Sequence, residues 1–182
     1  MVHSTGRGVA SGPAVTDETV IFNSAIHDLD LVPWLLGSPV TEVSWHAPET
    51  TSSNTDLRDP FFLQLRTADG VLSTVEIFLN ARYGYDMRCK VVCETGAIEI
   101  AEPHRVAVSS ELATSTGILA DFRPRSAESY RVELQKWVNA LNEGHTPGLA
   151  TVEDGRDATR AAAAAVKSMH SGGAFVSVEA SA

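Results

Sequence analysis

The strongest constraint on the fold is a hairpin pattern in the middle of the chain. Residues 61–79 read FFLQLRTADGVLSTVEIFL, two alternating strand-like runs that are joined through Asp69-Gly70. An Asp-Gly pair between such runs is typical of a β-hairpin turn. Val75 and Ile77 lie two residues apart in the second run, so they share one face of that strand. The sequence therefore predicts a hairpin with one apolar face.

Strand-like runs with short turns continue on both sides of this hairpin, so residues 40–121 are expected to be mainly β and antiparallel. Helical periodicity is found in two further segments, 24–36 and 126–143, where apolar residues recur at i, i+4, i+7 and i+11. These residues are Ala25, Leu29, Val32 and Leu36 in the first segment, and Tyr130, Leu134, Trp137 and Leu141 in the second. Asn23 or Ser24 is placed to cap the first helix.

A third helix is expected over 152–170, where Thr151 and Asp154 form a capping-box pattern before an alanine-rich run. Residues 1–20 are rich in Gly, Ser and Thr and are expected to be irregular. A chain of 182 residues is long enough for one domain with a sizeable core. The predicted fold class is therefore α+β: residues 1–182 form a single domain, with a single large, mostly antiparallel β-sheet and helices packed on one face.

The charge balance restricts the partners. The chain has 14 Lys and Arg against 23 Asp and Glu, a formal net charge of −9, which disfavours binding to nucleic acid. No apolar run approaches the roughly 20 residues that span a bilayer, and the N-terminus lacks the apolar core of a secretory signal. The expected location is therefore cytoplasmic, without membrane contact. No G-x-G-x-x-G or P-loop motif is present, so this chain is expected to bind no cofactor by itself.

The densest group of chemical side chains is His27, Asp28 and Asp30, at the head of the helix over 24–36. A histidine there can act as a general acid or base near neutral pH, and the alternative is an ordinary exposed histidine at a helix end. A metal-dependent hydrolase built on His27-Asp28 is a weak third hypothesis, because side chains of adjacent helical residues point about 100° apart. The other histidines lack ligand spacing, so no metal site is expected.

A pair of tyrosines forms a second candidate. Tyr83 and Tyr85 bracket Gly84, and on a strand they would share one face. A phenol beside a flexible glycine can hydrogen-bond a polyol or a carbonyl group. The alternative is that both are ordinary tyrosines of an amphipathic sheet.

Three stretches carry a family resemblance. NSAIHDLDLVPWLLG, EIFLNARYGYDMRCKVVCETGAIEI and SYRVELQKWVNAL resemble, in this order and spacing, the C-terminal domain of the Gfo/Idh/MocA oxidoreductases, and most of all the inositol 2-dehydrogenase branch. The resemblance implies an open, mostly antiparallel sheet whose free face builds oligomers. It also implies oxidation of a sugar or cyclitol hydroxyl, with hydride passing to a nicotinamide cofactor, NAD or NADP.

The same resemblance implies roles for single residues. His27 takes the position of the catalytic histidine that transfers the proton. Asn23 takes the position of the family's assisting acid, one turn earlier, and is a catalytic and substrate-binding candidate there. Tyr85 takes the position of a substrate-binding residue. No residue of this chain is assigned to cofactor or metal binding.

Departures from the family pattern qualify this assignment. Asn23 cannot stabilise an imidazolium by charge, as an acid would. Gly6 and Gly8 stand where the family's first strand carries His and Asn substrate contacts, and Pro33 replaces a basic residue before the tryptophan. The family's N-terminal Rossmann domain, with its glycine-rich loop and catalytic lysine, has no counterpart in the sequence. The isolated chain is therefore expected to be incapable of hydride transfer.

Two hypotheses follow. The first is the substrate-binding domain of an NAD(P)-dependent sugar or inositol dehydrogenase, inactive alone. The alternative is a non-catalytic oligomerising or ligand-binding module derived from that fold. The expected partners are a sugar or cyclitol, further copies of the chain through the free sheet face, and a separate Rossmann domain. Which polyol is bound, and whether the cofactor is NAD or NADP, stays open at this point.

Overall fold

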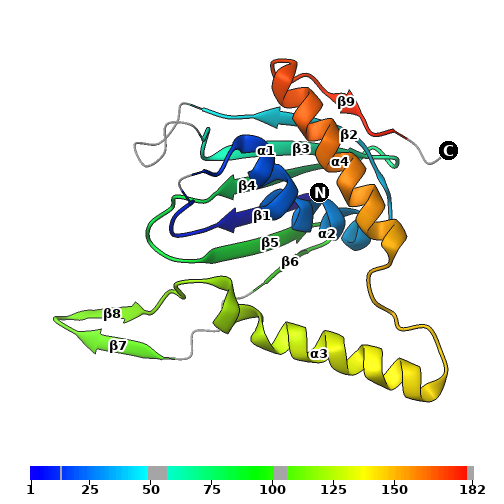
Figure 1. Ribbon diagram of the computed structural model, residues 1–182. Helices are drawn as coiled ribbons and strands as arrows, with labels where there is room; N and C mark the ends of the chain where they lie inside the picture. Colours follow the sequence, from blue (N-terminus) through cyan, green and yellow to red (C-terminus); the bar gives the residue numbers. More distant parts are fainter. Residues whose placement is uncertain (13, 49–56, 101–105, 180–182) are drawn as a thin grey trace.

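The computed structural model describes residues 1–12, 14–48, 57–100 and 106–179 (Figure 1). Its centre is a seven-stranded sheet in the order β6-β5-β1-β4-β3-β2-β9. The strands are β1 (Val2–Arg7), β2 (Val40–His46), β3 (Phe61–Thr67), β4 (Leu72–Phe78), β5 (Asp86–Val92), β6 (Ala97–Glu99) and β9 (Val176–Ser177). β1 and β4 pair in parallel, and the other neighbours pair antiparallel. The predicted α+β class with a large, mostly antiparallel sheet is confirmed.

The hairpin predicted around Asp69-Gly70 joins β3 to β4. The Thr67 amide donates to the Val71 carbonyl at 3.0 Å, and Gly70 adopts a φ of +79°, which a glycine tolerates without strain. Along both strands buried and exposed side chains alternate, and Val75 and Ile77 lie on the buried face. The local pattern alone therefore sufficed to place this hairpin and its inner face.

Residues 2–7 correct the expectation of an irregular N-terminal segment. They form β1, which lies in the middle of the sheet between β4 and β5. The sequence VHSTGR contains one strongly apolar residue, so its composition carries little strand signal. Pairing with two strands that follow some 70 to 90 positions later makes it a strand. The resemblance, which placed a first strand at Gly6, is the better guide here.

One continuous helical run covers the sheet, made of α1 (Asp17–Val20), the π-helical segment η1 (Ile21–Ala25) and α2 (Ile26–Leu36). It begins earlier than the expected residue 24, because Thr16 caps it by accepting a hydrogen bond from the Thr19 amide. α2 continues through Pro33 and ends at Gly37, which has a φ of +64°. The predicted inner stripe is buried at Ala25, Leu29 and Val32.

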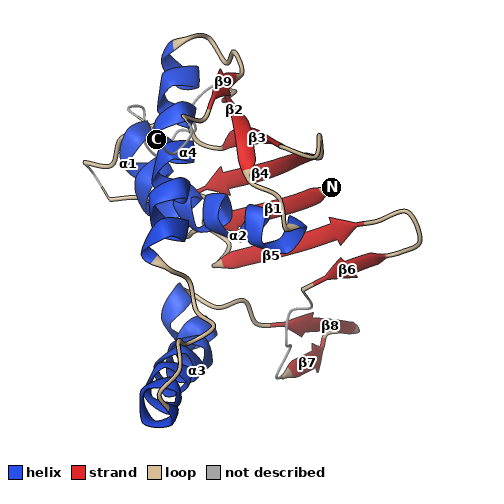
Figure 2. Ribbon diagram, turned by 90° about the vertical axis from the view of Figure 1, so that its right-hand side faces the viewer, coloured by secondary structure: helices blue, strands red, loops and turns tan. Residues whose placement is uncertain are grey.

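The alanine-rich helix α4 (Val152–His170) spans the expected residues and packs on β2 and α2. Its start is the predicted capping box between Thr151 and Asp154. Small side chains bring it close to its neighbours, and the buried ones are Ala158, Ala161, Ala162, Ala164 and Ala165. Figure 2 shows α1, α2 and α4 on one face of the sheet, with the opposite face open.

The long helix α3 (Phe122–Glu143) departs from the expected arrangement. It begins four residues before the expected start, because the Asp121 side chain accepts a hydrogen bond from the Arg123 amide at 2.8 Å. It lies below the sheet in Figures 1 and 2, away from α2 and α4. The hairpin of β7 (Ala107–Ser110) and β8 (Ala113–Thr116) precedes it and forms a separate two-stranded sheet. Helical periodicity showed which face of α3 is apolar, but not what covers it.

Candidate functional site

The first turn of α2 divides His27 and Asp28 between two environments. His27 is exposed, whereas Asp28 is only 2% exposed and accepts a hydrogen bond from the hydroxyl of Ser4 on β1. Adjacent helical residues point about 100° apart, so the pair separates as the sequence predicts. Asp28 thus ties the start of α2 to the sheet, while the imidazole of His27 stays accessible to a ligand.

Asp28 is the electrostatic centre of this region. Burial raises the pKa of its carboxyl, against the hydrogen bond from Ser4 and the favourable charge of protonated His27. Among the described residues its Oδ2 atom has no hydrogen-bond partner. Desolvation is the largest cause of the raised pKa of Tyr85 and of Cys89, and the negative charge of Asp28 raises both pKa values further. The candidate histidine of α2 and the candidate tyrosine before β5 therefore share one acidic neighbour.

Tyr85 is half-buried at the start of β5, where the chain after β8 also arrives. Its amide donates to the Leu119 carbonyl at 2.7 Å. Desolvation raises the pKa of the Tyr85 phenol, with Arg125 lowering it and Tyr130 raising it further. Arg125 also donates from Nη2 to the Met87 carbonyl at 3.0 Å. The first turns of α3 thus reach the same place as Tyr85.

Tyr83 lies on the opposite side of the sheet from Tyr85, which corrects the expectation that the two share a face. Residues 79–85 form a loop rather than a strand, and the positive φ angles of Arg82 (+60°) and Gly84 (+149°) break the alternation. A side chain at Gly84 would place its Cβ 2.2 Å from the Ile118 side chain, so glycine is required there.

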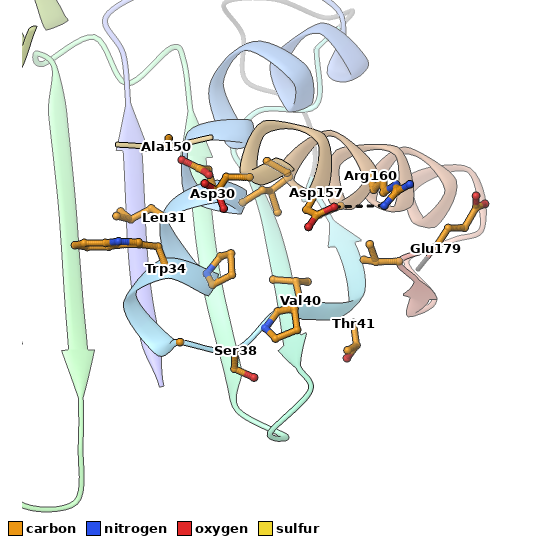
Figure 3. A pocket seen from close by; sticks show the side chains of 18 of the residues that line it. Asp30, Leu31, Trp34, Ser38, Val40, Thr41, Ala150, Asp157, Arg160 and Glu179 are labelled. Carbon is orange, nitrogen blue, oxygen red and sulfur yellow. Dashed lines mark hydrogen bonds and ion pairs between the residues drawn. The ribbon is translucent and has the colours of Figure 1, made fainter. Parts of the chain in front are cut away.

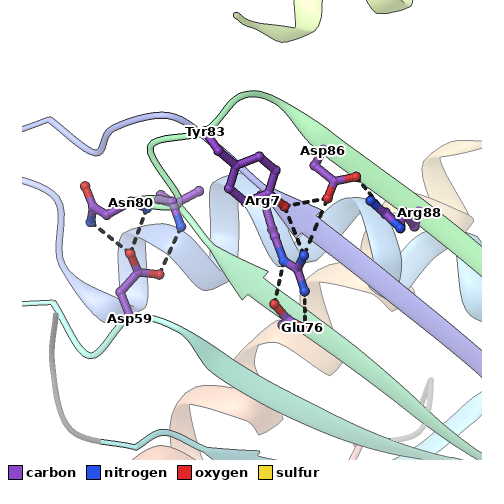
Figure 4. Close-up of polar contacts among 8 residues, drawn as sticks. Arg7, Asp59, Glu76, Asn80, Tyr83, Asp86 and Arg88 are labelled. Atoms are coloured by element: carbon purple, nitrogen blue, oxygen red, sulfur yellow. Dashed lines mark hydrogen bonds and ion pairs between the residues drawn. The ribbon is translucent and has the colours of Figure 1, made fainter. Parts of the chain in front are cut away.

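The Tyr83 hydroxyl belongs to a charged network on the open sheet face (Figure 4). It donates to Asp86 and accepts a hydrogen bond from Arg7 at 2.9 Å. Arg7 also forms a two-pronged ion pair with Glu76, at 2.7 and 2.9 Å. Burial opposes ionisation of Asp86, but hydrogen bonds from Arg88 and Tyr83 prevail and lower its pKa. This network is satisfied internally and joins β1, β4 and β5.

Three further positions were singled out by the resemblance, namely Asn23, Gly6 and Gly8. Asn23 is exposed on η1, one turn before His27. Gly6 lies in β1, where an added Cβ would come within 3.2 Å of the Ile77 side chain and 3.4 Å of Met87 Sδ. Gly8 follows the strand and would place a Cβ 3.4 Å from the Leu79 carbonyl. The structure therefore packs tightly where the resemblance expected side chains that contact a substrate.

A cavity of about 970 Å³ opens on the other flank of α2, between α2, α4, the start of β2 and the residues that follow β9 (Figure 3). Asp30 and Trp34 of α2 line it, together with Asp157 and Arg160 of α4, which form an ion pair at 3.4 Å. None of His27, Asn23 and Tyr85 lines it. The accessible histidine and the half-buried phenol therefore lie outside this cavity.

Over residues 1–12, 14–48, 57–100 and 106–179, no group of three or more His, Cys, Asp or Glu side chains is arranged to hold a metal ion. In that same part of the chain, no helix is both long and apolar enough to cross a bilayer.

Three residues that interact with His27 or Tyr85 were not recognised from the sequence: Asp28 as a buried acid, Arg125 and Tyr130. Asp28 lies three residues after Ala25 and four before Val32, both of which are buried, so this spacing could have placed it on the inner face. Tyr130 was assigned to an apolar stripe alone. No local signal brings α3 to Tyr85, because the two are far apart in the sequence.

The burial of Asp28 predicts a pH-dependent effect of Asp28→Asn. A raised folded-state pKa means that the stabilising form is protonated; its contribution is complete below the reference pKa of 3.8 and is lost as the pH rises through the folded-state pKa. Asn keeps the acceptor for Ser4 and carries no charge. We expect Asp28→Asn to be more stable relative to the wild type at pH 8 than at pH 5, that is, the free energy of unfolding of the variant minus that of the wild type is larger at pH 8.

Urea unfolding of both proteins at the two pH values measures this difference. Asp30→Asn is the matched control, because Asp30 lies on the same helix and is partly exposed. An equal difference between Asp28→Asn and wild type at both pH values would show that burial does not hold the Asp28 proton.

Residues 10–99 match the family model described as the GFO/IDH/MocA C-terminal domain. The matched part contains η1, α2, the first five strands after β1, and Tyr85. The chain belongs to the Gfo/Idh/MocA family.

Two curated relatives are similar to almost the whole of this chain. The chain is 49% identical over 179 residues to inositol 2-dehydrogenase 2 of Paenarthrobacter aurescens, a match that covers 98% of this chain and 54% of that protein. It is 38% identical over 173 residues to inositol 2-dehydrogenase 2 of Saccharopolyspora erythraea, covering 94% of this chain and 51% of the relative. The chain thus spans about half the length of the curated relatives it matches.

A solved structure supports the fold. The myo-inositol dehydrogenase of Lactobacillus casei, crystallised with NAD(H) and myo-inositol, superimposes with a TM-score of 0.93. The superposition covers 100% of this chain and 54% of that one, at 23% sequence identity. At this identity the likeness establishes the arrangement of helices and strands, α3 included.

Proposed function

We propose that this chain is the substrate-binding half of an NAD-dependent cyclitol dehydrogenase, in which His27 carries the proton of the reacting hydroxyl. The observation that carries the proposal is that Asp28 of α2 interacts electrostatically with two groups, its neighbour His27 and Tyr85 before β5. The names of the relatives support the substrate class, since they are inositol 2-dehydrogenases.

The described residues do not fit the nicotinamide cofactor itself. The loop between β1 and α1 leads from a strand through Gly8 and Gly12 into a helix. Its amides already have partners, because Gly8 N donates to the Phe78 carbonyl and Ser11 N to Asn80 Oδ1, both at 2.9 Å. A phosphate cradle needs free amides there. We therefore derive no hydride step for this chain and assign cofactor binding to a separate nucleotide-binding domain.

The chain's own contribution is to bind a polyol and to move its proton. The exposed imidazole of His27 can accept a proton from a hydroxyl near neutral pH. The Tyr85 phenol, with its pKa raised above the usual 10.0, stays protonated and both donates and accepts hydrogen bonds with neighbouring hydroxyls. A cyclitol presents a hydroxyl on every ring carbon, and we propose that one ring meets both groups.

The alternative, a non-catalytic oligomerising or ligand-binding module, is favoured by two departures. Asn23 carries no charge, and Gly6 is packed against Ile77 and Met87 without a side chain for a substrate. Under either hypothesis we propose that copies of the chain associate through the open sheet face. That face exposes Phe62, Leu72 and Val92.

Binding of myo-inositol is expected to shift the ring signals of His27 in NMR spectra of the 182-residue chain. The titration runs to tens of millimolar, far above the ~1 mM upper end of common KM values. Tyr85→Phe removes the phenol hydroxyl and is expected to weaken the binding several-fold, since a neutral hydrogen bond contributes about 1 kcal/mol.

His145 is the internal control, because its imidazole is exposed, pairs with Glu143 at 2.9 Å and lies at the far end of α3. NADH added to the same chain is expected to produce no titration heat. Unmoved His27 signals at the highest inositol concentration would contradict the proposal and leave a scaffold role.

A further inference from the structure

The cavity between α2 and α4 takes no part in the proposed function, because none of His27, Asn23 and Tyr85 lines it. Its volume of about 970 Å³ falls within the range of small-molecule sites. Its walls are largely apolar, and they include the side chains of Leu29, Leu31, Val40, Ala158, Ala161 and Val178. A concave apolar surface with a few polar groups is the usual form of such a site. The polar groups therefore decide which ligand it takes.

The charged side chains at the cavity are predominantly acidic. The carboxylates of Asp30, Asp154, Asp157 and Glu179 line it, against the guanidinium of Arg160, which gives the lining a formal charge of −3. The chain as a whole carries −9. Such a field repels anionic ligands and attracts cations. The sign of the charge thus favours a cationic ligand.

Asp30 is the acid that is left for a ligand. The other three carboxylates have partners within the chain, which are the Thr151 amide for Asp154, Arg160 for Asp157 and Lys167 for Glu179. Within the part of the chain that the structure describes, the Asp30 side chain has no hydrogen-bond or ion-pair partner. It is partly buried at the cavity. A carboxylate that gives up water there is stabilised by an opposite charge.

Trp34 adds an aromatic surface beside Asp30. The two residues lie four positions apart on α2, which places them on the same face of that helix, and both line the cavity (Figure 3). Trp34 is 76% exposed, so its ring is open to a ligand. An indole ring attracts a cation that lies over its face. The aromatic group thus favours the same sign of charge as the acid.

Two helix ends meet at the cavity. α2 ends there at Gly37, and the C-terminal end of a helix favours positive charge. α4 begins there, and its N-terminal end favours negative charge, which Asp154 already supplies within the capping box. The backbone therefore adds to the preference for a cation at α2 and is balanced at α4.

We propose that this cavity binds an organic ammonium ion with an apolar body. The ammonium group pairs with the Asp30 carboxylate and borders the Trp34 indole, and the body packs against the apolar walls. A neutral ligand of the same shape gains the apolar contacts alone. The inference is independent of the proposed function, because none of the three residues proposed for the substrate site lines the cavity.

Cyclohexylammonium and cyclohexanol are the probes, because they share a ring and differ in charge. Each is titrated at neutral pH into the isotope-labelled 182-residue chain, and NMR follows the Asp30 amide and the Trp34 indole N–H. We expect both signals to shift with cyclohexylammonium, at an affinity at least about threefold higher than that of cyclohexanol, in the range of a partly exposed charge pair. Equal affinities of the two probes, or titrations that leave both signals unmoved, would overturn the proposal.

Variants locate the charge contact. Asp30→Asn is expected to weaken the binding of cyclohexylammonium by at least about threefold and to leave that of cyclohexanol unchanged. Glu94→Gln is the matched control, because it removes one negative charge from an exposed turn outside the cavity and is expected to change neither affinity. An equal loss in both variants would show that the overall charge of the chain attracts the cation, which contradicts the proposal. The comparison of the two probes in the unaltered chain does not depend on the folding of a variant.

myo-Inositol separates this cavity from the proposed substrate site. It is expected to shift the ring signals of His27 and to leave the Trp34 indole signal in place. A shift at Trp34 as large as that from cyclohexylammonium would assign the cavity to polyols and overturn the ammonium class. A chain that binds cyclohexylammonium at Asp30, while inositol leaves His27 unmoved, contradicts the proposed function and supports the ammonium site.

Discussion

Replacing His27 by alanine is expected to lower the turnover number for inositol oxidation by about 10²–10⁴-fold, the range that one positioned acid–base residue contributes. The measurement uses a chimera in which residues 1–182 replace the matching half of the Paenarthrobacter aurescens inositol 2-dehydrogenase 2. The imidazole is exposed at the start of α2, where a substrate hydroxyl can reach it. Without it, that hydroxyl loses the group that accepts its proton. The KM is expected to change less than the turnover number, because the proposed substrate contact of Tyr85 is kept in this variant.

Initial rates of NADH formation, measured against inositol concentration, separate the two constants. His145→Ala removes another exposed imidazole, just past the far end of α3, and is expected to leave both unchanged. A loss of turnover below about tenfold for His27→Ala would contradict proton transfer by this residue. A rise in KM alone would favour the ligand-binding alternative.

Elements with strong local signals could be predicted from the sequence. The Asp69-Gly70 turn and the capping box at Thr151 need only neighbouring residues, and both occur as expected. β1 could not be recognised from its composition, because its strand character depends on pairing with β4 and β5. The helical run is capped by Thr16 rather than by Asn23, since Asn23 lies inside the π-helical segment η1, which connects α1 to α2.

The candidate site was predictable to the extent that helical geometry defines it. The divergence of His27 and Asp28 follows from 3.6 residues per turn, and the structure has one exposed and the other buried. Tyr83 and Tyr85 were wrongly placed together, because positive φ angles at Arg82 and Gly84 replace the strand by a loop. The approach of α3 to Tyr85 is a tertiary contact, which no periodicity encodes.

The largest loss of stability is expected from Asp59→Ala, at about 3 kcal/mol or more. Asp59 is 0% exposed and accepts three hydrogen bonds, from the amides of Leu79 and Asn80 at 2.9 Å and from Asn80 Nδ2 at 2.8 Å (Figure 4). Each buried donor left without a partner costs about 1–3 kcal/mol. Asn80 in turn accepts from the Ser11 amide at 2.9 Å, so the loss also loosens the chain after β1.

Urea unfolding gives the free energy difference, and Asp59→Asn separates charge from hydrogen bonding. Asn keeps one acceptor oxygen but turns an amide group toward the three donors, so an intermediate loss of about 1–2 kcal/mol is expected. Glu94→Ala removes an exposed carboxylate in the turn after β5 and is expected to stay within about 0.5 kcal/mol of the wild type. If Asp59→Ala matched that control, the three hydrogen bonds would not hold the ends of β1, β3 and β4 together, and the loop from β4 to Tyr85 would need another anchor.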